Sequence, residues 1–121
     1  MRPRSTTFRV LILASFAVAG AASAHATLLE AQPRAGETLA AAPERIRLRF
    51  NETLEPAFSK IVLRDGHGAA IRSGVATVET AHPDTLLLVP PSLPSGKYKL
   101  DWSTMTRDGH RTKGSVPFQV R

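Results

Sequence analysis

Alternation of apolar and polar residues with a period of two is the feature that most constrains the fold of this chain. In RIRLRF, residues 45–50, three arginines alternate with three large apolar residues. KYKLDW, residues 97–102, repeats the pattern, and SVPFQV, residues 115–120, has an apolar side chain at every second position. Since this period is that of a β-strand with one buried face, the three segments predict half-buried strands.

Shorter apolar segments predict four more strands, separated by turns rich in glycine and proline. These segments are TLLEA (27–31), KIVLR (60–64), GVATV (74–78) and TLLLV (85–89). No segment has a convincing helical period, and GETLAAAPE, residues 36–44, forms at most one helical turn. About seven short strands predict an all-β domain, an antiparallel sandwich or a small barrel. The predicted core comprises Leu28, Ile46, Leu48, Phe50, Ile61, Leu63, Leu86, Leu88, Tyr98, Leu100, Trp102, Val116, Phe118 and Val120.

Residues 1–24 predict a cleaved secretory signal peptide. Arginine-rich MRPRSTTFR precedes the apolar run VLILASFAVAG, and a small-residue cleavage site then ends at Ala24. The alternative is a membrane anchor, which requires about 20 apolar residues, and this run is shorter. We therefore expect cleavage before His25, export, no stable membrane insertion after processing, and a single domain over residues 25–121.

The domain that remains after removal of the leader is mildly basic and contains no cysteine. Residues 25–121 hold 13 of the 16 basic residues and all 10 acidic ones, so their net charge is +3. Such a balance gives no reason to expect a nucleic acid as a partner. Without cysteine, any metal site must use nitrogen, oxygen or thioether ligands, and Met105 is the one methionine in this range.

Cleavage after Ala24 would make His25 the first residue of the exported chain. A free α-amine beside an imidazole nitrogen can close a chelate ring around a metal ion. The alternative is that His25 follows the cleavage site by chance, since signal peptidase needs only small residues before the cut.

A second pair of candidate ligands lies in TMTRDGHRTKG, between two alternating segments. Asp108 and His110 flank Gly109, so a carboxylate and an imidazole stand two residues apart. On an extended segment such residues point the same way and can reach one ion. The alternative is an ordinary hairpin turn, in which Asp-Gly is common. The tripeptide by itself is weak evidence, because it recurs at residues 65–67.

Together, HATLLEAQPRAG, APERIRLRFNETLEP and GKYKLDWSTMTRDGHRTKGSVPFQV resemble the CopC family of periplasmic copper-binding proteins. The resemblance covers nearly the whole of residues 25–121, and it joins an N-terminal histidine to a distant Asp-x-His hinge. It implies a Greek-key β-barrel or sandwich of about seven strands, immunoglobulin-like in form. It also implies a periplasmic protein that holds one Cu(II) ion per chain through His25, Asp108 and His110. Glu52 matches a family glutamate that lies near the site and is not usually a direct ligand.

One stretch departs from a pattern found in part of the family. Some members have a methionine-rich loop with a histidine that binds Cu(I), whereas residues 60–75, KIVLRDGHGAAIRSGV, contain no methionine. We therefore expect a site for Cu(II) alone. We expect His67 to lie on the surface in a tight turn, and His82 to lie on the surface in a loop before Pro83.

The donors implied by the resemblance suit Cu(II). One amine, two imidazoles and one carboxylate give nitrogen and oxygen ligands, which Cu(II) prefers in a tetragonal arrangement, and Cu(II) stands highest in the divalent affinity order. Zn(II) prefers a tetrahedron, while this donor set does not separate Cu(II) from Ni(II). Because protons compete for amine and imidazole nitrogens, affinity should weaken below neutral pH.

We expect a binding protein without enzymatic activity, a carrier or buffer in copper homeostasis or resistance. One alternative is a copper-dependent oxidative enzyme, which also uses an N-terminal histidine. Against it, Asp108 would occupy a position that oxygen chemistry needs open, and at least four of the five aromatic residues in 25–121 belong to the predicted core. The other alternative is a metal-free adhesion or assembly module. The resemblance further suggests a membrane copper-import protein of the CopD type as a partner.

Overall fold

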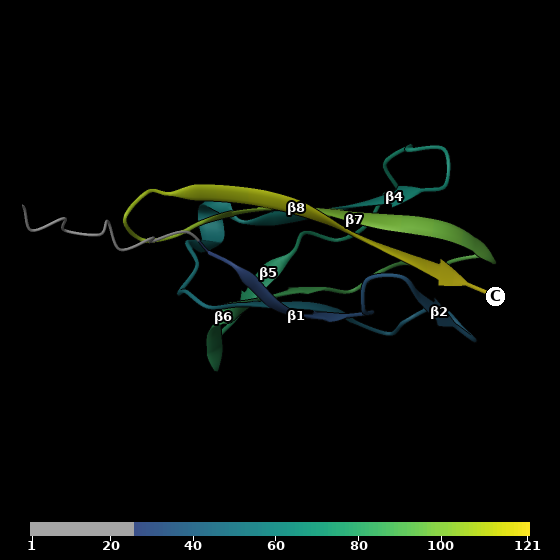
Figure 1. Ribbon diagram of the computed structural model, residues 1–121, viewed down its shortest axis with the longest axis horizontal. Coiled ribbons are helices and arrows are strands. Elements are labelled where there is room, and N and C mark those ends of the chain that lie inside the picture. The colour runs from purple at the N-terminus through teal and green to yellow at the C-terminus, as the bar shows by residue number, and fades with distance from the viewer. Residues whose placement is uncertain (1–25) are drawn as a thin grey trace, which may run out of the picture.

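Two four-stranded β-sheets face one another in the computed structural model, which describes residues 26–121 (Figure 1). The first sheet has the strand order β1 (Leu28–Gln32), β3 (Ile46–Phe50), β6 (His82–Leu88) and β5 (Thr77–Glu79). The second sheet has the order β2 (Glu37–Leu39), β8 (Arg111–Val120), β7 (Gly96–Met105) and β4 (Lys60–Asp65). A short 3-10 turn, η1 (Pro56–Phe58), precedes β4. The all-β class predicted from the alternation is therefore confirmed.

The described chain forms eight strands, one more than the seven segments predicted from the sequence. The additional strand lies within residues 36–44, which the sequence indicated could form at most one helical turn. Part of that segment is β2, which pairs in parallel with β8 and places Leu39 opposite Val120. The sequence did not predict this strand, since a strand of three residues is too short to show a period. His82 begins β6, although the His-Pro sequence indicated a loop.

The core lies between the two sheets and is made by the alternating apolar residues. Thirteen of the fourteen predicted core residues are buried, and Leu28 is partly exposed and packs against them. Phe50 of β3 meets Trp102 of β7 across the sandwich, with ring centroids 5.0 Å apart and an interplanar angle of 69°. Edge-to-face aromatic pairs add about 0.5–1.5 kcal/mol beyond the burial of their surface. This contact therefore helps to hold the two sheets together.

The indole of Trp102 covers Gly114, its partner across the β7–β8 pair. A Cβ atom at residue 114 would lie 2.5 Å from Cζ2 of the indole, so glycine is required there. The buried Nε1 has no hydrogen-bond partner among the described residues. This packing fixes the indole three residue pairs away from Met105 and Arg111, the last pair of the hairpin.

Residues 1–25 lie outside the part of the chain that the structure describes, and they include both the predicted leader and the predicted ligand His25. The signal peptide and its cleavage before His25 therefore stay predictions. Among residues 26–121, no helix is long and apolar enough to cross a membrane.

Candidate metal centre

The candidate centre is built on the tip of the long β7–β8 hairpin. The two strands pair antiparallel from Gly96 opposite Val120 to Met105 opposite Arg111. Beyond the last pair, the N–H of Thr106 donates to the carbonyl of His110 at 3.0 Å, and the N–H of Gly109 donates to the carbonyl of Thr106 at 3.0 Å. Gly109 has a φ of 87°, a left-handed conformation that favours glycine. The turn thus brings residues 108 and 110 together at one end of the sandwich.

Asp108 and His110 are in direct contact at this tip. Oδ2 of Asp108 lies 2.8 Å from Nδ1 of His110, and the Thr106 hydroxyl donates a short hydrogen bond to Oδ1 of Asp108. The Thr106 hydroxyl first, and the His110 imidazole second, hold the pKa of the Asp108 carboxyl below its usual value. The carboxylate is therefore anionic throughout the neutral range. The two side chains meet across a turn, rather than along the extended segment that the sequence suggested.

This contact determines how the imidazole of His110 can act. With Nδ1 held by the carboxylate, coordination of a metal ion by this ring would use Nε2. Histidine ligands in metalloproteins commonly donate their second ring N–H to a carboxylate, which fixes the tautomer and the direction of the ring. The Asp108–His110 pair therefore has a geometry that suits a metal-binding histidine.

The first described residues are attached beside the same hairpin. The Thr112 hydroxyl, two residues after His110, donates to the carbonyl of Ala26 at 2.9 Å. The N–H of Thr27 donates to Oδ1 of Asn51 at 2.7 Å, and the N–H of Asn51 donates back to the carbonyl of Thr27 at 3.1 Å. Ala26 is buried. Residue 26 is thus fixed at the end of the sandwich that carries Asp108 and His110.

Glu52 lies on the loop that follows β3 and is partly exposed. Two residues further on, Leu54 forms an isolated β-bridge with Thr106, and the N–H of Glu55 donates to the carbonyl of Met105 at 2.8 Å. These contacts attach the loop to the base of the hairpin turn. Glu52 therefore lies at the same end of the sandwich as the Asp108–His110 pair.

The other two histidines lie on the surface, as expected. His67 is exposed in the turn after β4, at the opposite end of the sandwich from the hairpin tip. His82 is exposed at the start of β6. Within residues 26–121, no three His, Asp or Glu side chains gather in a group that could hold a metal ion. Within the described residues, Asp108 and His110 are thus a pair of candidate donors.

Sequence reasoning did not identify the roles of Thr106 and Thr112. Thr106 orients the carboxylate of Asp108, and Thr112 links the start of the described chain to β8. The Thr112 hydroxyl lies 3.0 Å from the Thr104 hydroxyl of β7, so the two threonines form a polar pair inside the sandwich. The alternation of the strands predicts that Thr106 and Thr112 face inward. Because threonine is common in strands, no sequence pattern distinguished these two threonines as functional.

The chain belongs to the CopC domain family, whose family model matches residues 28–121. Copper resistance protein C of Pseudomonas syringae pv. tomato is 35% identical over 124 residues, covering 96% of each chain. The crystal structure of CopC from Methylosinus trichosporium OB3b is 33% identical with a TM-score of 0.75, covering 79% of this chain and 93% of that chain. PcoC, a methionine-rich copper resistance protein from Escherichia coli, is 31% identical with a TM-score of 0.69, covering 81% of this chain and 100% of its own. The family predicted from the sequence is therefore confirmed.

Proposed function

We propose that this protein is an exported, periplasmic copper-binding protein that carries or buffers one Cu(II) ion per chain. Its membership of the CopC domain family and its similarity to copper resistance proteins support a role in copper handling. In this proposal residues 1–24 are the cleaved leader, residues 25–121 are the working domain, and no enzymatic step is involved.

The observation that carries this proposal is the anchoring of Ala26 to the hairpin. The hydrogen bond from Thr112 holds the Ala26 carbonyl beside the strand that begins directly after His110. Covalent geometry puts the Cα atom of His25 about 3.8 Å from that of Ala26. A chain cleaved before His25 would therefore begin close to the Asp108–His110 pair.

The proposed ligands are the α-amine and imidazole of His25, the imidazole of His110, and the carboxylate of Asp108. A carboxylate held on Nδ1 cannot reach an ion on Nε2 of the same ring, so coordination by both residues requires the Asp108–His110 contact to open when the ion binds. Three nitrogen donors and one oxygen donor suit the tetragonal preference of Cu(II). The low pKa of Asp108 keeps it anionic, so it offsets part of the charge of the ion. Glu52, at the same end of the sandwich, would orient a ligand or a bound water.

The proposal is restricted to Cu(II) because soft ligands are scarce. PcoC is a methionine-rich copper resistance protein, whereas residues 25–121 of this chain contain one methionine, Met105. Thioether ligands favour Cu(I). We expect the copper to pass to or from a membrane copper-import protein of the CopD type.

A copper titration of the processed protein tests the proposal. The full-length gene is expressed with its own leader, the N-terminal residue is identified by mass spectrometry, and Trp102 fluorescence is followed as Cu(II) is added. Trp102 lies three residue pairs from the last pair of the hairpin, about 10 Å along the strand, where a paramagnetic ion quenches its emission. We expect quenching that saturates at one equivalent.

The matched control is a variant that keeps one extra residue ahead of His25 after processing, confirmed by mass spectrometry. The extra residue converts the His25 amine into an amide nitrogen, so binding should be much weaker. Equal binding in both forms would contradict the chelating terminus, and the absence of binding in both forms would favour the metal-free adhesion or assembly module.

A further inference from the structure

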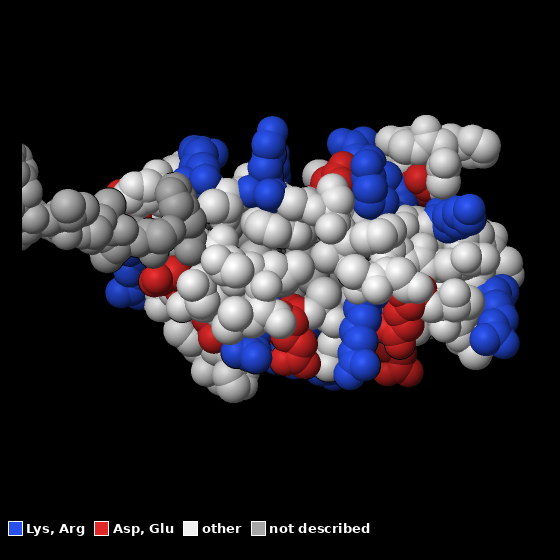
Figure 2. Space-filling model, in the orientation of Figure 1, with Lys and Arg blue, Asp and Glu red and all other residues white. Residues whose placement is uncertain are grey.

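The outer face of the second sheet carries a concentration of positive charge. The outward positions of β4, β7 and β8 hold six basic residues and one acidic residue, Asp101. Figure 2 shows basic residues predominating along the upper edge of the molecule, over these three strands. The six basic residues, called the basic face below, are Lys60, Arg64, Lys97, Lys99, Arg111 and Lys113.

The strand register arranges the basic face in rows across the sheet. Lys60 and Lys113 both lie opposite Ser103, one on each side of β7, and Arg64 lies opposite Lys99. Arg111 and Lys97 extend the face toward its two ends. The rows span eight residues of β7, about 27 Å, and two strand spacings, about 10 Å. The result is a broad, flat surface.

Asp101 neutralises only part of this charge. Its carboxylate accepts hydrogen bonds from Ser115 and from Arg64, both at 2.7 Å, and lies 3.6 Å from Nζ of Lys99. Within the described chain, Lys60, Lys97 and Lys113 form no ion pair. Most of the lysines on the face are therefore available to an external anion.

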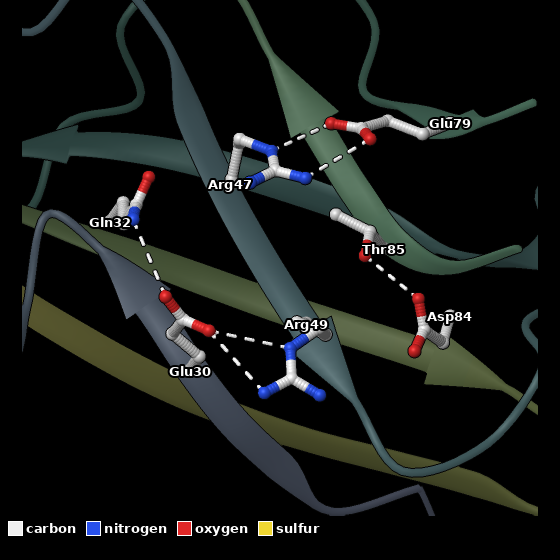
Figure 3. Close-up of polar contacts among 7 residues, drawn as sticks. All are labelled: Glu30, Gln32, Arg47, Arg49, Glu79, Asp84 and Thr85. Carbon is white, nitrogen blue, oxygen red and sulfur yellow. Dashed lines mark hydrogen bonds and ion pairs between the residues drawn. The ribbon is translucent and has the colours of Figure 1, made fainter. Parts of the chain in front are cut away.

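The outer face of the first sheet is different, because its charges pair with one another (Figure 3). Nε of Arg47 lies 2.7 Å from Oε1 of Glu79, and Nη2 of Arg49 lies 3.4 Å from Oε2 of Glu30. When the basic face and Asp101 are set aside, residues 25–121 hold seven basic and nine acidic residues, a net charge of −2. The net +3 of this range is therefore concentrated on one side of the molecule.

The chemistry of the basic face favours a lipid surface over a protein partner. Protein interfaces are depleted in lysine and are organised around buried aromatic or arginine anchors. Here the centre of the face is a shallow, open hollow of about 560 Å³ lined mainly by lysine, arginine and serine side chains. Lysine is a hydrated point charge that attracts anions without a fixed register, which suits a fluid layer of phosphate groups.

An exposed aromatic ring at the hairpin end adds a second feature. Phe58 of η1 is 52% exposed, and the guanidinium of Arg111 lies over its ring, 5.6 Å from the centroid. At a membrane surface, burial of an apolar side chain such as phenylalanine adds to the electrostatic attraction between basic residues and anionic lipids. Phe58 is also the one aromatic residue of the described chain outside the core.

We propose that the basic face, together with Phe58, binds peripherally to a bilayer rich in anionic phospholipid. The interaction is reversible and depends on the fold, not on the metal. In this orientation the molecule lies flat, and the hairpin tip with Asp108 and His110 projects sideways along the membrane surface. A membrane-embedded partner could then reach the site without a large rotation of the protein.

Vesicle co-sedimentation tests this proposal. The protein obtained from the full-length gene, with its N-terminus read by mass spectrometry, is mixed with vesicles of phosphatidylglycerol and phosphatidylcholine or of phosphatidylcholine alone. We expect binding to the anionic vesicles only, at about 0.01 M salt, and its loss at about 1 M salt, where the screening length falls to about 3 Å. The variant K60Q/K113Q should bind roughly 25-fold more weakly, about fivefold for each lysine.

The matched control removes two exposed arginines outside the basic face, Arg34→Gln and Arg45→Gln, for the same change in net charge. It should keep most of the binding, and thermal melts confirm that both variants fold. Equal losses in the two variants would overturn the proposal, because net charge alone would then explain binding. Binding to soluble polyglutamate without binding to anionic vesicles would also overturn it and would point to an acidic protein surface.

Discussion

The same tripeptide, Asp-Gly-His, occurs at opposite ends of the sandwich with opposite outcomes. At residues 65–67, Oδ1 of Asp65 accepts the backbone N–H groups of His67 and Ala69 at 2.9 and 3.0 Å. At residues 108–110, the carboxylate of Asp108 contacts the Thr106 hydroxyl and the His110 imidazole. The first carboxylate stabilises its own turn, whereas the second holds a side chain that can bind a metal.

The position of the left-handed glycine separates the two turns. In the first turn Gly68, which follows the tripeptide, has a φ of 83°, and Gly66 has no positive φ. In the second turn it is Gly109, between the aspartate and the histidine, that is left-handed. Each of these glycines closes its turn, by a hydrogen bond from Gly68 to the Asp65 carbonyl in the first and from Gly109 to the Thr106 carbonyl in the second. The tripeptide therefore begins the first turn, whereas in the second turn Asp108 is the third residue and the histidine follows the turn. The comparison teaches that the Asp-Gly-His sequence alone does not define a candidate ligand pair. What defines it is whether the aspartate carboxylate contacts the histidine side chain or backbone N–H groups of its own turn.

Replacing the histidine of each turn by alanine should give the largest difference between the two turns, measured as the change in Cu(II) affinity. We expect His110→Ala to weaken Cu(II) binding by at least about 100-fold, since loss of a ligand costs no less than loss of an orienting partner. His67→Ala should leave the affinity unchanged. Competition titrations against a chelator of known affinity measure both variants, and similar losses in the two would contradict the assignment of the site.

Replacing the glycine of each tripeptide, Gly66 or Gly109, by alanine should reduce the free energy of unfolding by different amounts. Gly109→Ala forces a side chain into a left-handed conformation and should cost about 1–2 kcal/mol, although no atom lies within 4 Å of the new Cβ. In Gly66→Ala the nearest atom to the new Cβ is the Lys97 carbonyl oxygen, at an ordinary contact distance of 3.4 Å. We expect less than about 0.5 kcal/mol there. Urea unfolding of the copper-free proteins measures both, and equal costs would mean that the backbone difference has no energetic effect.

The environment of Asp108 should be visible in its titration. Thr106→Val removes the hydrogen bond that contributes most to the low pKa of Asp108, so the pKa should rise toward the ordinary value of an aspartate side chain. A pKa that is lower in the folded protein stabilises the fold above the unfolded value, and this stabilisation is lost as the pH falls through the folded value. The stability difference between wild type and Thr106→Val should therefore narrow between pH 7 and pH 3. NMR of the carboxyl carbon reports the pKa directly, and an unchanged value would show that Thr106 does not perturb the carboxyl.

The smallest effect is expected for Asp65→Asn. The side-chain carbonyl of asparagine can accept the same two backbone N–H groups, so stability should change by less than about 0.5 kcal/mol. Asp65→Ala removes both hydrogen bonds and should cost about 1 kcal/mol. Thermal melts at neutral pH distinguish the two variants. If asparagine were as costly as alanine, the charge of Asp65 would matter and not its turn geometry.

Most of the fold could be predicted because the strands that build it are long and regular. The alternation in β3, β7 and β8 determines which face is buried, and the predicted residues of these strands are all buried. β2 escaped prediction because its three residues are ordered by pairing with β8, a long-range contact that no local pattern encodes. His82 is drawn into β6 by its pairing with Glu79 across the short β5–β6 turn, despite the turn preference of the sequence around it.

The candidate site could be predicted only in part. The spacing of Asp108 and His110 indicated that the two groups could meet, and they do. The hydrogen bond from Thr112 to Ala26 joins residues 86 positions apart, so it depends on the completed sandwich. The role of Thr106 depends on the turn geometry, since its hydroxyl bonds to Asp108 within the turn that the Gly109 N–H closes on the Thr106 carbonyl.

Strand β8 has a consequence for any attachment to this protein. Thr112 near its start holds Ala26, while at its far end the N–H of Arg121 donates to the carbonyl of Leu39 at 2.9 Å. Ten residues of strand separate the two ends by about 30 Å. Figure 1 shows the C-terminus at the end of the molecule opposite the β7–β8 hairpin tip. A fluorescent protein, a tether to a sensor surface or a further domain joined after Arg121 would therefore leave the hairpin tip unobstructed. The same cargo placed ahead of residue 26 would crowd it directly.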